Sequence, residues 1–285
     1  MTADAALDLG SDIRVTPILG GRLRLDGGAM FGVVPRPLWE RYNRPDDRNR
    51  IANACRCLLV QSTDTTVLID TGCGDRFDAK GRDIFAVDTD VSLLASLEET
   101  GVDPADVTHV VLTHLHFDHS AGALQAGAGG LVPTFPNATH IVQRGEFEDA
   151  QAGRSIMRSS YLPEDLDALK NSVDWLWTEG DGDVLPHVSV EVTGGHTRHH
   201  QSVLINGPSE TLLFPGDVLP TRAHLRPYWV MAYDMIPYDT LTKKQELARR
   251  ACEGRWIIAW DHDPDDPFSR LIKDEAGFHA VAVDE

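Results

Sequence analysis

Residues 113–119 hold four side chains within seven positions that can bind a metal ion. They are His114, His116, Asp118 and His119. The preceding segment, residues 107–112, is apolar and rich in β-branched residues, which predicts a buried strand. The loop that follows a strand can direct several side chains to one point. Neutral imidazole is the commonest metal ligand, and an aspartate adds an oxygen that suits Zn²⁺ or Fe²⁺. This spacing therefore favours a metal site over a polar loop with chance histidines.

Three further candidate ligands each follow a predicted strand. They are His196, Asp217 and His262, after the strands predicted at residues 188–192, 211–214 and 256–260. Junctions of this kind lie at one edge of a sheet, so side chains far apart in sequence can converge there. Each of the three taken singly would more often be an ordinary loop residue. Their occurrence together with the first four predicts one shared site.

Length and charge limit the classes of function. The chain has 285 residues, of which 42% are hydrophobic, enough for a large α/β domain with a substantial core. Its net charge is −18, and we find no cluster of Lys and Arg of the kind that neutralises nucleic-acid phosphates. The same charge argues against polyanionic substrates. We therefore expect a small-molecule substrate and no nucleic-acid partner.

Targeting signals and cysteines indicate the compartment. The first ten residues lack the basic and apolar regions of a secretory signal. No stretch approaches the roughly 18 apolar residues that a membrane span needs. The four cysteines do not form the pattern of a disulfide scaffold, and Cys55 and Cys57 alternate along a predicted strand as small core residues would. We expect a cytoplasmic protein with no membrane partner.

The predicted elements alternate between strands and helices, with no internal repeat and no low-complexity linker. This predicts a single domain over residues 1–285. Residues 13–25 are expected to form an opening hairpin that turns at Gly20 and Gly21. The stretches 26–47 and 144–180 carry several aromatic residues that could cover the chain's own core, form a lid or bury against a second copy in a homodimer.

The order of these ligands resembles that of a known superfamily. The pattern H-x-H-x-D-H, followed by a His, an Asp and a final His, is similar to that of the metallo-β-lactamase fold hydrolases. The resemblance runs from about residue 13 to the C-terminus. It implies an α/β (α+β) fold, the αββα four-layer sandwich, with a dinuclear metal site at one edge. The segment 68–72 also resembles a motif of the superfamily, in which Asp70 would orient a ligand histidine.

The resemblance also implies a role for each ligand. His114, His116 and His196 would hold the first metal, Asp118, His119 and His262 the second, and Asp217 would bridge the two. The metals would be Zn²⁺ or another divalent ion, Mn²⁺, Fe²⁺ or Co²⁺. Two such ions about 3.5–4 Å apart can hold a hydroxide between them at neutral pH. Asp118 could also receive or relay a proton during catalysis.

Within the superfamily, the quorum-quenching lactonase branch is the most similar. Residues 26–35 and residues 229–234 resemble that branch and the related organophosphate hydrolases. The substrate implied is an N-acyl homoserine lactone, opened at its ester bond. A phosphotriester hydrolase on the same fold is the alternative, and a non-catalytic metal-binding protein is the alternative from a different class.

An acyl lactone needs an apolar groove for its acyl chain and polar groups that bind its lactone head group. The residues considered for the groove are Met30, Phe31, Trp229 and Met231. Core packing is an equal interpretation of these four. Tyr233 or His224 could donate to the carbonyl or to the leaving oxygen, while His224 could equally be a hydrogen-bonded loop histidine. The chain departs from the lactonase pattern at Pro220, where a Tyr is common, and at Arg198 and His199, while His200 is expected to be structural.

Overall fold

The computed structural model describes residues 6–284. Their contacts divide the chain into two compact units. The first unit contains the residues up to Leu23 together with residues 54–179, and the second contains residues 24–53 together with the chain from Gly180 onward. The prediction of a single domain stays a prediction. The expected absence of a secretory signal concerns residues 1–10, of which residues 1–5 lie outside the described part.

A sheet of seven strands, in the order β1-β2-β3-β4-β5-β8-β9, forms most of the first unit. The strands are β1 (Leu7–Asp8), β2 (Arg14–Asp26), β3 (Arg50–Gln61), β4 (Thr66–Ile69), β5 (His109–Val111), β8 (Thr139–Gln143) and β9 (Asp174–Thr178). From β4 to β9 neighbouring strands are parallel. The apolar residues Val110 and Val111 of β5 are completely buried, as expected for a central strand of a parallel sheet.

Helices cover one face of this sheet. They are α4 (Leu93–Thr100), α6 (Arg144–Gln151) and α7 (Pro163–Ser172). Leu97, Phe147 and Leu166 of these helices share a core with Leu68 and Leu112. The smaller elements of the unit are α3 (Ala79–Phe85), α5 (Phe117–Ser120) and the strand pair β6 (Leu124–Gly127) and β7 (Gly130–Pro133).

The second unit contains another seven-stranded sheet, in which the strands follow their order in the chain. They are β10 (Gly182–Leu185), β11 (Val188–Val192), β12 (Gln201–Asn206), β13 (Thr211–Phe214), β14 (Ile257–Ala259), β15 (Phe268–Asp274) and β16 (Gly277–Val281). The long helix α8 (Pro237–Glu253) connects the parallel pair β13 and β14. Leu247 and Ala251 of α8 pack on Leu213 and Ile258 of the sheet. Two short helices, α1 (Gly27–Phe31) and α2 (Arg36–Trp39), also belong to this unit.

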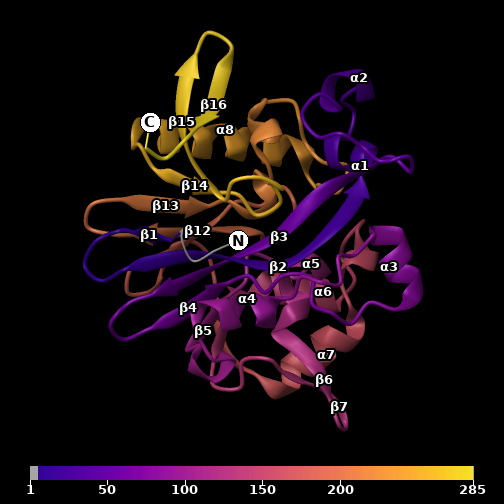
Figure 1. Cartoon of the computed structure of the whole chain (residues 1–285), viewed down its shortest axis with the longest axis vertical. Coiled ribbons are helices and arrows are strands. Elements are labelled where there is room, and N and C mark those ends of the chain that lie inside the picture. The colour runs from indigo at the N-terminus through magenta and orange to yellow at the C-terminus, as the bar shows by residue number, and fades with distance from the viewer. Residues whose placement is uncertain (1–5, 285) are drawn as a thin grey trace. The chain divides into compact units, whose positions relative to one another are not determined.

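The predicted mixed α/β fold class is confirmed, because each unit combines one large sheet with a layer of helices (Figure 1). The predicted hairpin over residues 13–25 is wrong, since β2 runs without a break from Arg14 to Asp26. A Cβ atom on Gly20 would lie 2.8 Å from the thiol of Cys57 and 2.8 Å from the backbone of Gly72. The glycine here therefore permits close packing within the sheet and does not form a turn.

All four cysteines are free thiols, and Cys55 and Cys57 are buried as predicted. Among the helices described between residues 6 and 284, none has the length and apolar character needed to cross a membrane.

Candidate metal centre

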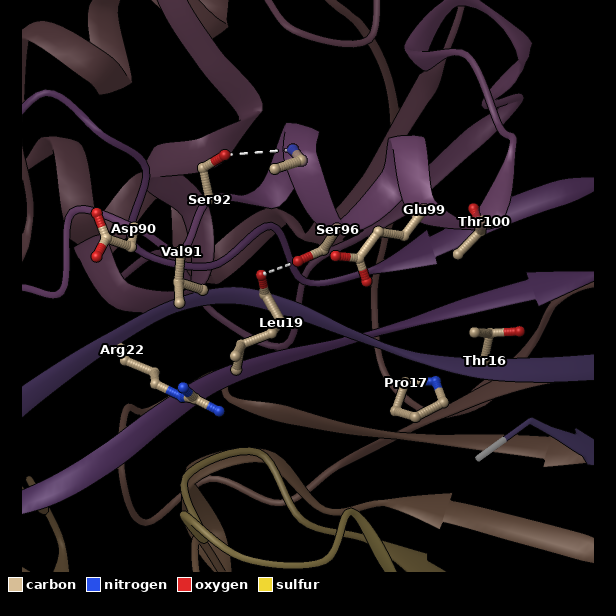
Figure 2. Close-up of a pocket in the computed structure, with 11 residues that line it drawn as sticks. Thr16, Pro17, Leu19, Arg22, Asp90, Val91, Ser92, Ser96, Glu99 and Thr100 are labelled. Carbon is tan, nitrogen blue, oxygen red and sulfur yellow. Dashed lines mark hydrogen bonds between the residues drawn. The ribbon is translucent and has the colours of Figure 1, made fainter. Parts of the chain in front are cut away.

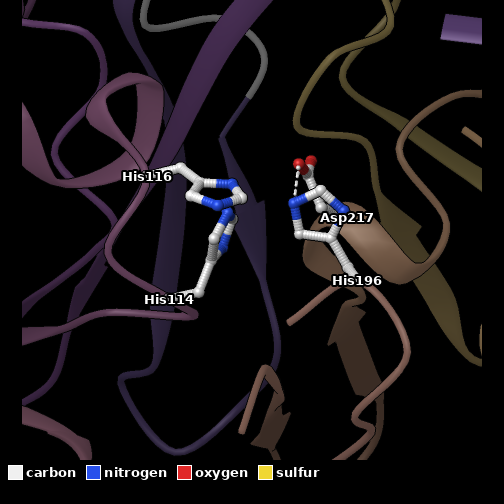
Figure 3. A group of neighbouring side chains, drawn as sticks. All are labelled: His114, His116, His196 and Asp217. Carbon is white, nitrogen blue, oxygen red and sulfur yellow. Dashed lines mark ion pairs between the residues drawn. The ribbon is translucent and has the colours of Figure 1, made fainter. Parts of the chain in front are cut away.

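The first unit brings together the four side chains of the H-x-H-x-D-H motif, which we call the first cluster: His114, His116, Asp118 and His119. They occupy the loop after β5 and the short helix α5, and all four are buried. The ring of His114 lies 4.6 Å from that of His116 and 4.1 Å from that of His119, measured between centroids. The His119 Nε2 atom is 4.0 Å from the Asp118 carboxylate. Figure 3 shows the His114 and His116 rings next to each other, and their planes are nearly perpendicular.

Asp70 orients the first cluster from the end of β4. One of its carboxylate oxygens lies 2.8 Å from His119 Nδ1, and the carboxylate also accepts hydrogen bonds from the backbone N–H and the hydroxyl of Thr113 at 2.7 and 2.8 Å. A carboxylate at Nδ1 selects the tautomer whose Nε2 lone pair is available to a metal. This contact is the one that the sequence resemblance implies for Asp70.

A second carboxylate supports the same loop, and sequence reasoning missed it. Glu146 of α6 is buried and accepts the Leu115 N–H at 3.2 Å and the Tyr161 hydroxyl at 2.9 Å. The Tyr161 ring in turn packs 4.7 Å from the His116 ring. Burial, reinforced by the negative charge of Glu146, raises the pKa of Tyr161 well above its usual value, so this hydroxyl stays protonated and donates.

The second unit brings together another group of buried side chains, which we call the second cluster: His196, Asp217, Asp261 and His262. Each follows a strand, namely β11, β13 or β14. The two Asp217 oxygens lie 2.9 Å from His196 Nε2 and 2.9 Å from His262 Nε2. Figure 3 shows the His196 ring against the Asp217 carboxylate. The possible ligand atoms of Asp217, Asp261 and His262 lie within 4.8 Å of one another.

Carboxylates flank the His196 ring on both sides. Its Nδ1 is 3.0 Å from Asp234, a buried residue that the sequence did not single out, and its Nε2 faces Asp217. Burial alone would lower the pKa of His196, but Asp217 and then Asp234 raise it to about 10. The imidazole therefore holds a proton between Nε2 and Asp217, at a place where a divalent cation would satisfy both groups.

The donor sets of both clusters fit divalent metals. Imidazole nitrogens and carboxylate oxygens are the ligands of Zn²⁺, Mn²⁺ and Fe²⁺ in proteins, and buried charges of this kind require a cation or hydrogen bonds to compensate them. His200 is not one of these donors. Its Nε2 accepts the backbone N–H of Asp217 at 3.1 Å, and its Nδ1 lies 2.6 Å from the Thr193 hydroxyl, so it supports Asp217 as a structural residue would.

His224 belongs to the second unit and is buried. Its Nε2 donates to the Met30 carbonyl at 2.9 Å, its Nδ1 lies 2.7 Å from the Thr221 hydroxyl, and its ring stacks on Phe31 at 5.0 Å. Burial, with a smaller contribution from the charge of Lys244, lowers the pKa of His224 to about 3, so the ring is neutral. These contacts favour the hydrogen-bonded loop histidine over the substrate donor.

The four residues considered for an apolar groove also lie in the second unit. Met30, Phe31 and Met231 are almost completely buried. Trp229 is half-buried, and its ring makes a T-shaped contact with Phe31 at a centroid distance of 5.5 Å. This burial favours core packing for the first three. Tyr233 is half-buried in the turn before α8.

A cavity of about 240 Å³ lies in the first unit beside Phe117, and sequence reasoning did not find it. Phe77, Phe85 and Phe117 line it together with Leu162, and the three phenylalanine rings contact one another at centroid distances of 5.3 to 6.0 Å. Phe117 stands between His116 and Asp118 in the sequence, so the apolar cavity begins at the metal-binding motif itself. The position of Phe117 within the motif was the one sequence signal that pointed to this cavity.

A smaller cavity of about 110 Å³ lies between β2 and α4 (Figure 2). The Ser96 hydroxyl donates to the Leu19 carbonyl at 2.9 Å beside it, and Ser92 caps the helix by accepting the Ala95 N–H. The residues that line it lie between positions 16 and 22 and between positions 90 and 100, and none of them belongs to either cluster.

Comparisons with known proteins agree with this chemistry. The family model described as the Metallo-beta-lactamase superfamily matches residues 50–262. The N-acyl homoserine lactonase AttM of Rhizobium radiobacter is 32% identical over 186 residues, which cover 63% of this chain and 66% of that protein. The matched region thus spans slightly less than two thirds of the relative's length.

Two solved structures are also similar. A probable metal-dependent hydrolase from Staphylococcus aureus has a TM-score of 0.86 and 30% identity, with 93% of this chain and 94% of that chain covered. AidC, a dizinc quorum-quenching lactonase, has a TM-score of 0.77 over 97% of this chain and 96% of its own. At 18% identity, the second likeness concerns the fold alone.

Proposed function

Because the chain belongs to the metallo-β-lactamase superfamily, we propose that it is a metal-dependent hydrolase that opens the ring of N-acyl homoserine lactones. The observation that carries this proposal is the pair of buried clusters, which contain all seven ligand residues of the superfamily pattern in their order. Curated relatives with this activity, about 30% identical, support the lactone as substrate.

The proposed ligands follow the superfamily pattern. The first cation would bind His114, His116 and His196, the second Asp118, His119 and His262, with Asp217 shared by both. We propose that the two units act together as one catalytic domain in this way. When bound, two divalent cations, Zn²⁺ or one of Mn²⁺, Fe²⁺ and Co²⁺, would supply an activated water and polarise the substrate carbonyl.

The protein's own groups then divide the remaining tasks. Asp70 and Asp234 accept hydrogen bonds from the Nδ1–H groups of His119 and His196, which would make each Nε2 lone pair available to a metal. Asp118 would receive a proton and return it to the leaving alkoxide. With Pro220 at the position where a Tyr is common, Tyr233 is the proposed donor to the carbonyl oxygen.

The acyl chain would enter the cavity lined by Phe77, Phe85 and Phe117. Its volume of about 240 Å³ and its aromatic lining suit a flexible hydrocarbon chain and exclude water from it. Since this cavity begins at Phe117, a chain seated there would leave the lactone ring beside the first cluster.

A hydrolysis panel tests the proposal. Purified protein, stripped and then reloaded with metal, is assayed with acyl homoserine lactones, simple lactones and aryl phosphotriesters. We expect the acyl lactones to be the fastest. Fast phosphotriester turnover without lactone turnover would identify the alternative hydrolase, and bound metal without any turnover would identify a non-catalytic metal-binding protein.

A matched pair of variants tests the ligands. His116→Ala should lose both bound metal and activity. His279→Ala removes a surface histidine that pairs with Asp274 at 2.9 Å, and it should lose neither. Wild-type turnover by His116→Ala would refute the ligand assignment.

We further propose that the protein acts in the cytoplasm, since four free thiols suit a reducing compartment. A homodimer is also proposed. Val33, Tyr228 and Tyr238 of the second unit are between 74% and 90% exposed, and a partner copy could cover them. Light scattering on purified protein gives the mass in solution, and a monomer at micromolar concentration would refute the dimer.

A further inference from the structure

Asp261 belongs to the second cluster but not to the seven ligands of the superfamily pattern. It follows β14 directly, precedes His262 and is 1% exposed. One of its oxygens accepts the backbone N–H of His262 at 3.0 Å. Its possible ligand atom lies within 4.8 Å of those of Asp217 and His262. The chain therefore holds two buried carboxylates where the pattern requires one.

This arrangement differs from that of the neighbouring carboxylate Asp263. Asp263 accepts the backbone N–H groups of Arg222 and Asp265 at 3.1 and 3.2 Å, and the Arg222 guanidinium lies 3.7 Å away. Asp217 and Asp261 instead place possible ligand atoms within 4.8 Å of each other in a buried region, and a divalent cation bound there would offset their like charges.

We propose that Asp261 is an additional metal donor that shifts the preference of this centre from Zn²⁺ toward Mn²⁺ or Fe²⁺. This inference rests on the proposed metal-dependent function and specifies which metal serves it. Zn²⁺ favours few ligands and accepts nitrogen or sulfur readily, whereas Mn²⁺ favours higher coordination by hard oxygen atoms. A second carboxylate raises both the number of donors and their share of oxygen.

The test measures the dissociation constants of Mn²⁺ and Zn²⁺ by chelator competition on metal-free protein, without any activity assay. The variants are Asp261→Asn, which keeps the shape and the acceptor for the His262 N–H, and the matched control Asp263→Asn. We expect Asp261→Asn to weaken Mn²⁺ binding at least about tenfold and Zn²⁺ binding less than about threefold. The control should change the ratio of the two constants by less than about twofold. An equal effect of Asp261→Asn on both metals, or no effect, overturns the inference.

The failure of this inference is distinct from the failure of the proposed function. Wild-type protein that binds neither metal refutes both. Wild-type protein that binds metal with a Mn²⁺ to Zn²⁺ ratio unaffected by Asp261→Asn refutes only the additional donor.

Should Asp261→Asn not fold, crystals of the wild-type protein soaked in Mn²⁺ give the answer directly. An anomalous manganese peak within about 2.5 Å of an Asp261 oxygen supports the inference. A peak bound only by other residues overturns it.

Discussion

Replacing Asp234 by Asn tests how the protein prepares His196 for a metal. The buried Asp234 carboxylate faces two groups, His196 Nδ1 at 3.0 Å through one oxygen and the Met231 N–H at 3.1 Å through the other. An asparagine has one oxygen and one NH₂ group in the same shape. It can therefore accept from only one of these groups.

The backbone donor of Met231 cannot change its chemistry, whereas the imidazole can. We expect the asparagine oxygen to accept the Met231 N–H and its NH₂ group to face His196 Nδ1. Nδ1 must then be an acceptor, so the ring has no proton on Nδ1 and keeps its single proton on Nε2, the atom that would bind metal. Binding must either reverse this tautomer or leave a buried donor unsatisfied. That costs about 1–3 kcal/mol, which corresponds to a roughly 5- to 150-fold weaker metal affinity.

The assay is chelator competition at neutral pH, with the thermal midpoint of the metal-free protein measured in parallel. Asp46→Asn is the control, because Asp46 also lies in the second unit and also accepts from backbone N–H groups and from a side chain, in that case Arg50. It should bind metal like the wild type. An Asp234→Asn protein with a metal affinity within twofold of the wild type would show that this tautomer argument is wrong.

Three further predictions concern other parts of the chain. Burial lowers the pKa of His140 from 6.5 to about 4, so the unfolded state takes up the proton first as the pH falls, and the free energy of unfolding should drop by about 3 kcal/mol across that window. Urea unfolding at pH 7 and pH 4.5 should show a smaller drop for His140→Phe than for the wild type. An equal drop in the two proteins would exclude His140 as the cause. Phe85→Trp should fill part of the apolar cavity and lower kcat/KM for long-chain lactones roughly fourfold per displaced methylene, with short-chain lactones unaffected. An equal loss of kcat/KM for all chain lengths would mean that the acyl chain binds elsewhere. Lys244 donates to the carbonyls of His224, Arg226 and Trp229, so Lys244→Met should cost about 3 kcal/mol of stability in calorimetry, and a loss below about 1 kcal/mol would mean that water replaces the ammonium.

Local sequence patterns were sufficient to predict much of the secondary structure. The strands expected at 188–192 and 211–214 coincide with β11 and β13, and the strand expected at 107–112 contains β5. Period-2 alternation and runs of β-branched residues are local signals that depend little on the rest of the chain. The helices α1 and α2 were missed within the stretch 26–47 because each is only about one turn long and offers no periodicity to detect.

Glycine at positions 20 and 21 misled the prediction for a physical reason. A Gly pair serves both in turns and where another backbone approaches closely, and only the packed sheet distinguishes the two. In β2 the neighbours are the Cys57 thiol and Gly72, which come from distant parts of the sequence.

The sequence by itself determined the family and the kinds of ligand, because the metal-binding residues are a matter of chemistry and of spacing after strands. Tertiary structure alone decided what surrounds them. Asp234 reaches His196 across 38 positions, Glu146 reaches Leu115 across 31, and Phe77, Phe85 and Phe117 join around one cavity. No local periodicity encodes such pairs, since they depend on which strands become neighbours and on where each loop leaves its sheet.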